Sequence, residues 1–172
     1  MRQLIAALRH AHENGIIHRG INLKNIMVTT DEGQAKLIDF GICKIKGLIQ
    51  KGTTFQFATN RYAAPEVGYH SENATERGDI FSLGAVFYFM FTNKEPSLPE
   101  TSSEIIDKAT GIDVALRPIL QKMTALEPSQ RYENLIDLEI ALAPIYSKYL
   151  NSGERYLIAI PRINSLIYAI IR

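Results

Sequence analysis

The sequence has very little cysteine, no tryptophan and almost no net charge. Its 172 residues include a single cysteine, and 19 Lys and Arg are balanced by 18 Asp and Glu, for a net charge of +1. The lone Cys43 excludes an internal disulfide and a cysteine-rich zinc site, and it favours a reducing, cytoplasmic location. The charge balance argues against a broad electrostatic nucleic-acid binder. With 46% hydrophobic residues the chain is also unlike a disordered protein, so we expect a folded domain.

Long uncharged runs are also absent. The apolar C-terminal stretch, residues 156–171, is interrupted by Arg162 and contains Pro161, and no uncharged run in the sequence approaches the ~18 residues that a membrane-spanning helix needs. The uncharged run from Gln3 to Leu8 is too short for the hydrophobic part of a signal peptide. We therefore predict no transmembrane segment and no signal peptide.

The apolar patterns predict a mostly α-helical fold with one small β-hairpin. The spacing of Leu4, Leu8 and Ala11 is helical, and Asn14-Gly15 would end that helix. A turn signal at residues 31–33 separates two strand-like segments, 25–30 and 35–38. Three further ranges have helical patterns: 79–91, which is apolar all round, 112–126 and 132–142. Residues 41–62 predict a long loop, and residues 93–103 a connector.

Four short motifs follow one another in a fixed order. They are His18-Arg19 with Asn25 six residues after the arginine, Asp39-Phe40-Gly41, Ala64-Pro65-Glu66, and Asp79-Ile80-Phe81-Ser82-Leu83-Gly84. Each alone is weak, but the ordered set, with a strand pair inside it, is specific. Over about residues 3–143 the chain resembles the C-terminal lobe of the eukaryotic-type Ser/Thr protein kinases. The resemblance implies a kinase-like lobe at 1–143 and an unassigned apolar tail at 144–172.

The resemblance also implies ATP and Mg²⁺ as cofactors. Asn25 and Asp39 match the residues that hold the metal on the ATP phosphates, and oxygen atoms of this kind are the ligands that Mg²⁺ prefers. Met27 matches the residue that packs beneath the adenine ring. From the residues alone, Asp39 could equally be an ordinary turn residue at the end of a strand.

Further matches are structural or regulatory. His18 and Phe40 match a hydrophobic column, Gly41 matches a flexible turn position, and Asp79 matches a carboxylate that accepts hydrogen bonds from the catalytic-loop backbone. Arg131 matches an arginine that pairs with the glutamate of Ala-Pro-Glu, here Glu66.

Arg19 matches an arginine that can pair with a phosphate on the activation loop. That loop holds Thr53 and Thr54, which could also be plain loop residues, and Thr59, whose place before Tyr62 resembles the Ser/Thr branch. For His10, His12 and His70 the spacing suggests no metal site, and we expect packing or surface positions.

The sequence departs from the family in the catalytic loop. The family pattern His-Arg-Asp-x-Lys-x-x-Asn is here His-Arg-Gly-Ile-Asn-Leu-Lys-Asn. Gly20 stands where the catalytic Asp would accept the substrate proton, and Asn22 stands where a Lys would steady the phosphate. Lys24 lies two residues after Asn22, so its position in the loop does not match that of the family lysine. Loss of a general base typically costs ~10²–10⁴ in rate, so we expect a catalytically inactive, pseudokinase-like domain.

The sequence before residue 18 also contains no Gly-rich phosphate loop and no strand lysine, so we expect the N-terminal lobe to be absent and ATP to bind weakly or not at all. Three functions follow as alternatives. The chain is a binding module for a protein partner, a fragment of a decayed kinase, or a subunit whose N-terminal lobe another chain supplies. The tail is expected to pack back on the lobe or to meet a partner.

Overall fold

The computed structural model describes residues 1–30, 33–40, 44–45, 61–67, 74–96 and 103–151. Its central element is helix α2, Glu76–Thr92, which is buried without a break from Gly78 to Tyr88. The helix ends at Asn93, whose φ of 55° lies in the left-handed region that often terminates helices. A helix that is apolar on every side has to be surrounded by other elements, and the other helices supply that cover.

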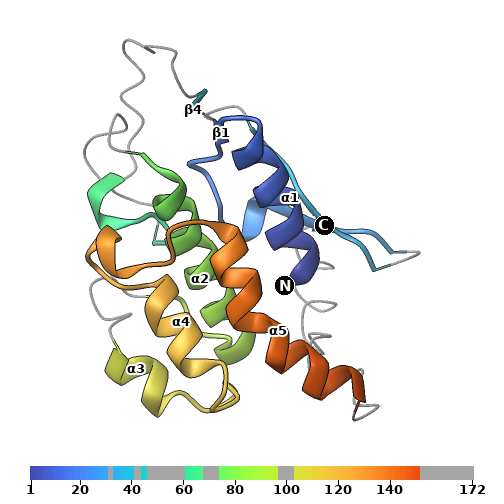
Figure 1. Ribbon diagram of the computed structural model, residues 1–172, viewed down its shortest axis with the longest axis vertical. Coiled ribbons are helices and arrows are strands. Elements are labelled where there is room, and N and C mark those ends of the chain that lie inside the picture. The colour runs from blue at the N-terminus through green and yellow to red at the C-terminus, as the bar shows by residue number, and fades with distance from the viewer. Residues whose placement is uncertain (31–32, 41–43, 46–60, 68–73, 97–102, 152–172) are drawn as a thin grey trace.

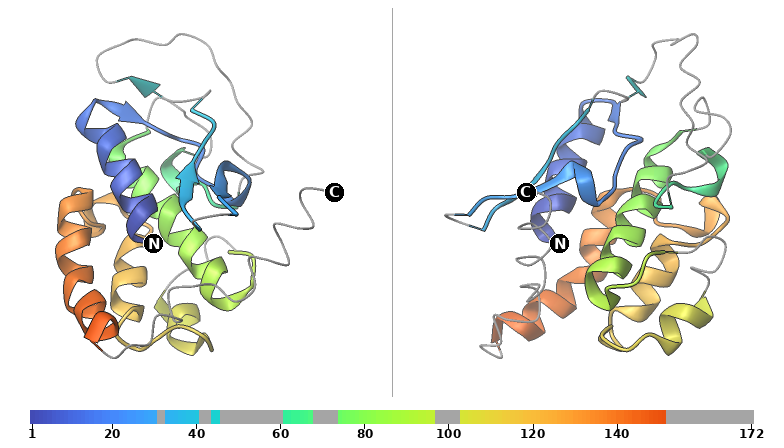
Figure 2. Two further views of the ribbon diagram at one scale, coloured as in Figure 1. Left: turned by 90° about the vertical axis from the view of Figure 1, so that its right-hand side faces the viewer. Right: turned by 180° about the vertical axis from the view of Figure 1, so that it is seen from behind.

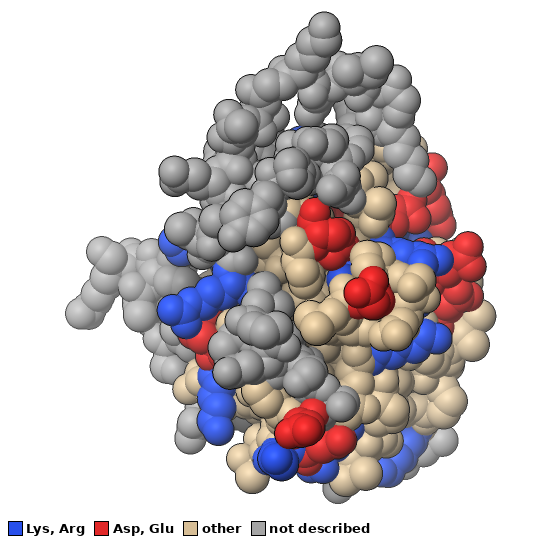
Figure 3. All heavy atoms as spheres, turned by 90° about the vertical axis from the view of Figure 1, so that its left-hand side faces the viewer, with Lys and Arg blue, Asp and Glu red and all other residues tan. Residues whose placement is uncertain are grey.

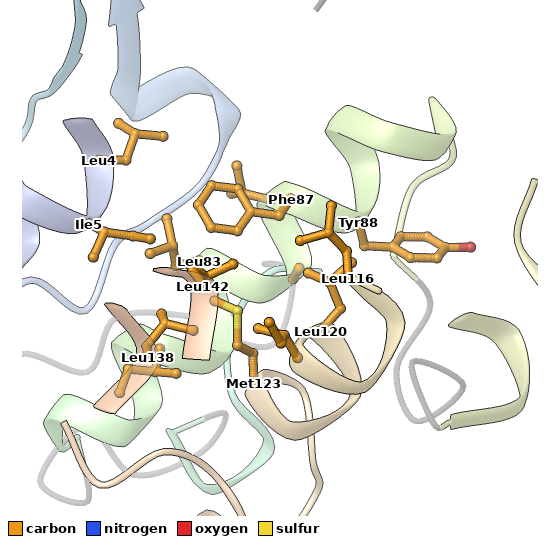
Figure 4. Packing of buried hydrophobic residues seen from close by; sticks show 14 of the residues in the cluster. Leu4, Ile5, Leu83, Phe87, Tyr88, Leu116, Leu120, Met123, Leu138 and Leu142 are labelled. Carbon is orange, nitrogen blue, oxygen red and sulfur yellow. The ribbon is translucent and has the colours of Figure 1, made fainter. Parts of the chain in front are cut away.

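Within the described ranges, four other helices contribute side chains to the same core as α2. They are α1 (Arg2–Glu13), α3 (Ser103–Lys108), α4 (Arg117–Met123) and α5 (Leu135–Asn151). In Figure 1, α2 runs beside α4, which in turn contacts α3 and α5, and α1 contacts α5. Figure 4 shows side chains from α1, α2, α4 and α5 converging in one core, among them Leu4, Leu83, Phe87, Leu120, Met123 and Leu138.

The crossing of α2 and α4 depends on a glycine. A Cβ placed on Gly84 would lie 2.8 Å from Cβ of Met123 and 2.8 Å from Cγ2 of Thr124, closer than carbon atoms pack. Gly84 therefore allows the two helices to approach at this point, and a side chain there would push them apart.

Among the residues that the structure describes, the strands form two separate antiparallel pairs. Strands β2 (Ile26–Val28) and β3 (Ala35–Leu37) form the predicted hairpin, with Met27 opposite Lys36. Strand β1 (Ile16–Ile17) pairs with β4 (Lys44–Ile45), and this second pair was not predicted. A strand of two residues is too short to show an alternation of apolar and polar side chains. In addition, β4 lies inside the range that was predicted to be a long loop. The strands and α1 occupy one end of the molecule, and α3 and α4 the other (Figure 2).

Three single turns of 3-10 helix complete the described elements: η1 (Leu23–Asn25), η3 (Pro65–Val67) and η5 (Pro128–Gln130). On the face shown in Figure 3, acidic and basic side chains are interspersed, without a large area of one sign. No helix within the described ranges has both the length and the hydrophobicity that crossing a bilayer requires.

The mostly helical fold with a small β-hairpin is confirmed, with three corrections to element bounds. The helix predicted at 112–126 is confined to α4, because Asp113 accepts backbone hydrogen bonds from Ala115 and Leu116 in a turn before it. The six-residue α3 was missed; it begins at Ser103, the last residue of the predicted connector, and continues to Lys108. The third, α5, begins at Leu135 and continues through Pro144 to Asn151, beyond the end predicted at residue 142. The rest of the 144–172 tail lies outside the described residues.

Candidate functional site

A buried carboxylate at the start of α2 holds the segment that follows β1. Asp79 is 2% exposed, and its two carboxylate oxygens accept hydrogen bonds from the backbone N–H groups of His18 and Arg19, at 2.8 and 2.9 Å. A carboxylate that receives several hydrogen bonds is well compensated for its burial. The catalytic-loop segment is therefore anchored directly to the core helix.

His12 is the second partner of this carboxylate. Its Nε2 lies 2.8 Å from Oδ2 of Asp79, and both side chains are buried. The packing position that the sequence suggested for His12 agrees with its burial, but its partner Asp79 was not predicted. A signal existed, because His12 follows Leu8 by four residues on the buried face of α1. A polar residue on such a face needs a hydrogen-bonding partner.

Two non-glycine residues near this anchor have left-handed backbone conformations. Arg19 has a φ of 62° and Asp39 a φ of 61°. Such conformations are uncommon for residues with side chains and persist where surrounding contacts impose them. For Arg19 one of those contacts is the hydrogen bond from its own N–H to Asp79. Conformations of this kind concentrate at functional sites, and both residues belong to the predicted site.

The imidazole of His18 connects the loop to the β2–β3 hairpin. Its Nδ1 accepts a hydrogen bond from the N–H of Gly20 at 3.2 Å, so Nε2 carries the proton and donates to the carbonyl of Ile38 at 3.2 Å. The ring lies 4.5 Å, centroid to centroid, from that of Phe40. Burial lowers the pKa of His18, and the nearby Asp79 charge opposes this only in part. The ring is therefore a neutral structural link.

Inside the loop, two asparagine side chains converge on one carbonyl. The Gly20 carbonyl accepts hydrogen bonds from Nδ2 of Asn22 at 2.9 Å and Nδ2 of Asn25 at 2.7 Å. The Oδ1 of Asn22 accepts the N–H of Lys24 at 2.8 Å. Both ends of the Asn22 amide are thus engaged within the loop, and residue 20 has no side chain. At these two positions the loop offers neither a proton acceptor nor a cation.

The predicted metal ligands lie at the open end of the hairpin. The carbonyl of Asn25 accepts the N–H of Ile38 at 2.9 Å, which places Asn25 next to Asp39. Because Nδ2 of Asn25 is engaged with Gly20, Oδ1 is the amide atom that could ligate a cation. One carboxylate and one amide oxygen fit a Mg²⁺ ion that takes its other ligands from water and phosphates. Within the described ranges no group of three or more His, Cys, Asp or Glu could hold a metal unaided.

The same end of the hairpin presents two apolar side chains to solvent. Met27 is 56% exposed and Phe40 is 39% exposed, both unusual for large apolar residues. Met27 lies on β2, so the position matched to the adenine-packing residue is accessible in this structure.

A second cluster lies at the other side of the start of α2. Arg131 is fully buried, and its guanidinium pairs with both carboxylate oxygens of Glu66, at 2.6 and 2.9 Å. It also donates to the carbonyls of Ala125, Leu126 and Arg77, and it lies over the ring of Phe81 at 4.8 Å. The structure thus contains the Glu66–Arg131 ion pair that the resemblance implies, and it ties η3 to the core.

The structure brings most of the predicted site residues into these two clusters. The loop cluster contains His18, Arg19, Gly20, Asn22, Asn25, Asp39, Phe40 and Asp79, with Met27 on the adjoining strand. Gly41, Thr53, Thr54 and Thr59 lie outside the described residues, as does Cys43.

The arrangement agrees with comparisons to known proteins. The family model for the protein kinase domain matches residues 1–144. A probable serine/threonine-protein kinase of Clostridium acetobutylicum is 32% identical over 167 residues, which cover 90% of this chain and 25% of that protein. PknD, a serine/threonine-protein kinase of Mycobacterium tuberculosis, is 32% identical over 157 residues, covering 82% of this chain and 23% of PknD.

PrkC, a serine/threonine-protein kinase of Bacillus subtilis, is 28% identical over 171 residues, which cover 92% of this chain and 26% of PrkC. The chain therefore spans about a quarter of the length of these curated relatives. The match of the family model covers well over half of the chain, and the order of the motifs agrees with it. The chain belongs to the protein kinase domain family.

Proposed function

We propose that this chain is a non-catalytic kinase-like domain, of the pseudokinase type, that acts as a binding module for a protein partner. The proposal rests on the residues at two positions of the catalytic loop, Gly20 and Asn22. Gly20 provides no side chain where the family has its proton acceptor, and both ends of the Asn22 amide are engaged within the loop.

The chemistry of phosphoryl transfer explains why these two changes matter. The reaction depends on positioning the nucleophile and neutralising charge on the transferring group. Without an acceptor at residue 20, the substrate hydroxyl is neither oriented nor deprotonated, a loss of ~10²–10⁴ in rate. Without a cation at residue 22, developing charge on the phosphate is less well stabilised. Both changes affect the same chemical step, so their separate effects on the rate need not multiply.

Kinase-family relatives use ATP and Mg²⁺ in general. In this chain Asn25 and Asp39 remain as candidate metal ligands, and Met27 as the candidate contact to an adenine ring. We propose that these residues bind Mg²⁺–ATP weakly or not at all. The lone cysteine of the sequence supports a cytoplasmic location for the module.

The retained Asn25 and Asp39 favour a second candidate function. In that case the chain is one part of an ATP-dependent protein Ser/Thr kinase, and the remaining contacts to the nucleotide come from elsewhere. The two candidates differ in whether Asp39 matters for nucleotide binding.

Phosphate transfer from radiolabelled ATP with Mg²⁺, to the chain itself and to a general protein substrate, tests the first proposal. We expect no transfer above the level of the Asp39→Ala variant. Asp107→Ala is the matched control, because Asp107 is an exposed acid on α3 whose carboxylate accepts a hydrogen bond from Gln121. Transfer that survives Asp107→Ala and disappears in Asp39→Ala would overturn the proposal.

Thermal unfolding with and without Mg²⁺–ATP separates the two candidates further. A ligand that binds the folded state raises the melting temperature. No rise supports the non-catalytic module, whereas a rise that is lost in Asp39→Ala supports the second candidate. A binding module also has to fold by itself, so we expect one cooperative transition of a monomer.

A further inference from the structure

Helix α5 lies at the outer edge of the helical bundle, as the left view of Figure 2 shows, and it has an exposed apolar face on the side away from the core. Ile136 is 50% exposed and Ile140 is 66% exposed, and one helical turn separates them. Ala143 and Pro144 are exposed in the next turn, whereas Leu138 on the opposite side is fully buried. We call the four exposed residues the isoleucine face. A contiguous apolar patch on a helix surface is typical of an interaction site.

Two oppositely charged residues flank the isoleucine face, one at each end of the helix. Asp137 is exposed in the first turn of α5, and Lys148 is exposed in its last turn. Lys148 follows Asp137 by eleven positions, which is close to three full turns at about 3.6 residues per turn, so both lie on the same flank of the helix. The Lys148 ammonium is 3.9 Å from the Asp113 carboxylate, but 66% of the lysine side chain is exposed. A second carboxylate can therefore reach it.

We propose that the isoleucine face packs against the same face of a second copy of this chain, with the two α5 helices antiparallel about a two-fold axis. In such a pair, two residues at equal distances on either side of the axis meet across the interface. An axis midway between Ile140 and Pro144 brings the isoleucine of one copy opposite the proline of the other. An axis midway between Asp137 and Lys148 brings these two charges together. The two midpoints differ by half a residue, or ~0.8 Å along the helix, so the apolar and the charged residues define the same axis.

The charges favour the antiparallel direction over the parallel one. A parallel pair would place Asp137 beside Asp137 and Lys148 beside Lys148, and like charges across an interface are unfavourable. In the antiparallel pair each acid meets a lysine, and the start of each helix lies beside the end of the other, where the helix dipoles attract. Because the face is complementary to itself in both apolar shape and charge, these arguments favour a second copy over an unrelated protein as its occupant.

The size of the face sets the strength of the contact. One helix face with four apolar residues and two symmetric ion pairs is small for a protein interface, so we expect a dissociation constant of ~10–100 μM. The chain is then a monomer in dilute solution and a dimer when concentrated. This inference goes beyond the proposed function and holds whether or not the catalytic loop is active.

Sedimentation equilibrium of the full chain, at concentrations below and above the expected dissociation constant, tests the proposal. We expect a reversible monomer–dimer equilibrium. Ile140→Glu should weaken it at least about tenfold, because it places two charges in the apolar contact. Met27→Glu is the matched control, since Met27 is 56% exposed on β2, outside α5, and melting temperatures check that both variants stay folded. A chain that stays monomeric throughout overturns the proposal, and so does association that Ile140→Glu leaves unchanged or that Met27→Glu abolishes.

A charge exchange tests the direction of the helices. Asp137→Lys alone, or Lys148→Asp alone, brings like charges together twice in the dimer, and each should weaken association about five- to tenfold. The double variant restores both attractions and should associate to within about twofold of the wild type. Lys108→Asp, at an exposed position of α3, is the control and should have no effect. A double variant that associates no better than the single ones would exclude the antiparallel pairing and overturn the proposal.

Discussion

The Nε2 of His12 lies 2.8 Å from Oδ2 of Asp79, and both side chains are buried. The same carboxylate accepts the backbone N–H groups of His18 and Arg19. One buried acid therefore joins α1, the catalytic-loop segment and α2. The side chains of Gly20 and Asn22 take no part in this connection, so it does not depend on which residues stand at these two positions.

The first prediction concerns this buried pair. We expect His12→Ala to lower the free energy of unfolding by about 1–3 kcal/mol, because Asp79 loses one hydrogen-bonding partner in a buried setting. Asp79→Ala should cost more, since it also removes the partner of two backbone N–H groups. Urea denaturation measures both. His10→Ala, at an exposed position on the same helix, is the control and should change stability by less than about 0.5 kcal/mol. A similar loss in both histidine variants would contradict the prediction.

The second prediction compares two glycines of α2. A Cβ at Gly84 would lie 2.8 Å from atoms of Met123 and Thr124, whereas a Cβ at Gly78 would meet Cγ2 of Val67 at 3.4 Å, an ordinary contact. We expect Gly84→Ala to destabilise the protein by about 1–3 kcal/mol through overpacking. Gly78→Ala should be neutral or slightly stabilising, since alanine favours helices by about 1 kcal/mol over glycine. Thermal unfolding of the two variants gives the comparison, and the reverse order would refute it.

The third prediction concerns Glu66 and Arg131. Removing one partner from a buried ion pair typically costs about 3–5 kcal/mol. Arg131→Ala should cost more than Glu66→Ala, because Arg131 also loses its bonds to three backbone carbonyls and its contact with Phe81. A double-mutant cycle measured by denaturation isolates the pair and should give a coupling of about 0.5–3 kcal/mol. Equal single losses with no coupling would argue against this account.

The fourth prediction concerns pH and His18. Burial lowers the pKa of His18 below its ordinary value of 6.5, so the unfolded chain takes up this proton before the folded chain does. The resulting stability is present above about pH 6.5 and is lost as the pH falls from there to the pKa of the folded state. Denaturation curves of the wild type and His18→Phe between pH 7.5 and 5 measure the effect. The variant should lose less stability than the wild type over this interval, and parallel losses would exclude a contribution from His18.

Several parts of the fold could be predicted from local patterns. The apolar face of α1, the all-apolar α2 and the β2–β3 hairpin each repeat a spacing over enough residues to be recognised. The β1–β4 pair and α3 could not be predicted, because two-residue strands and a six-residue helix are too short to show a period. The length of α5 was underestimated, since the helical pattern was recognised only as far as residue 142 and the helix continues to Asn151.

The candidate site, like the fold, could be predicted from the sequence only in part. The ordered motifs predicted the site positions, and the identity of residue 20 as glycine means that this position has no side chain to accept a proton. These conclusions depend on residue type and order, which the sequence determines. Tertiary structure decided which partners each side chain takes. It paired His12 with Asp79, and it directed the amides of Asn22 and Asn25 to the Gly20 carbonyl. Such contacts join residues up to 67 positions apart, and packing, rather than local spacing, decides which of them form.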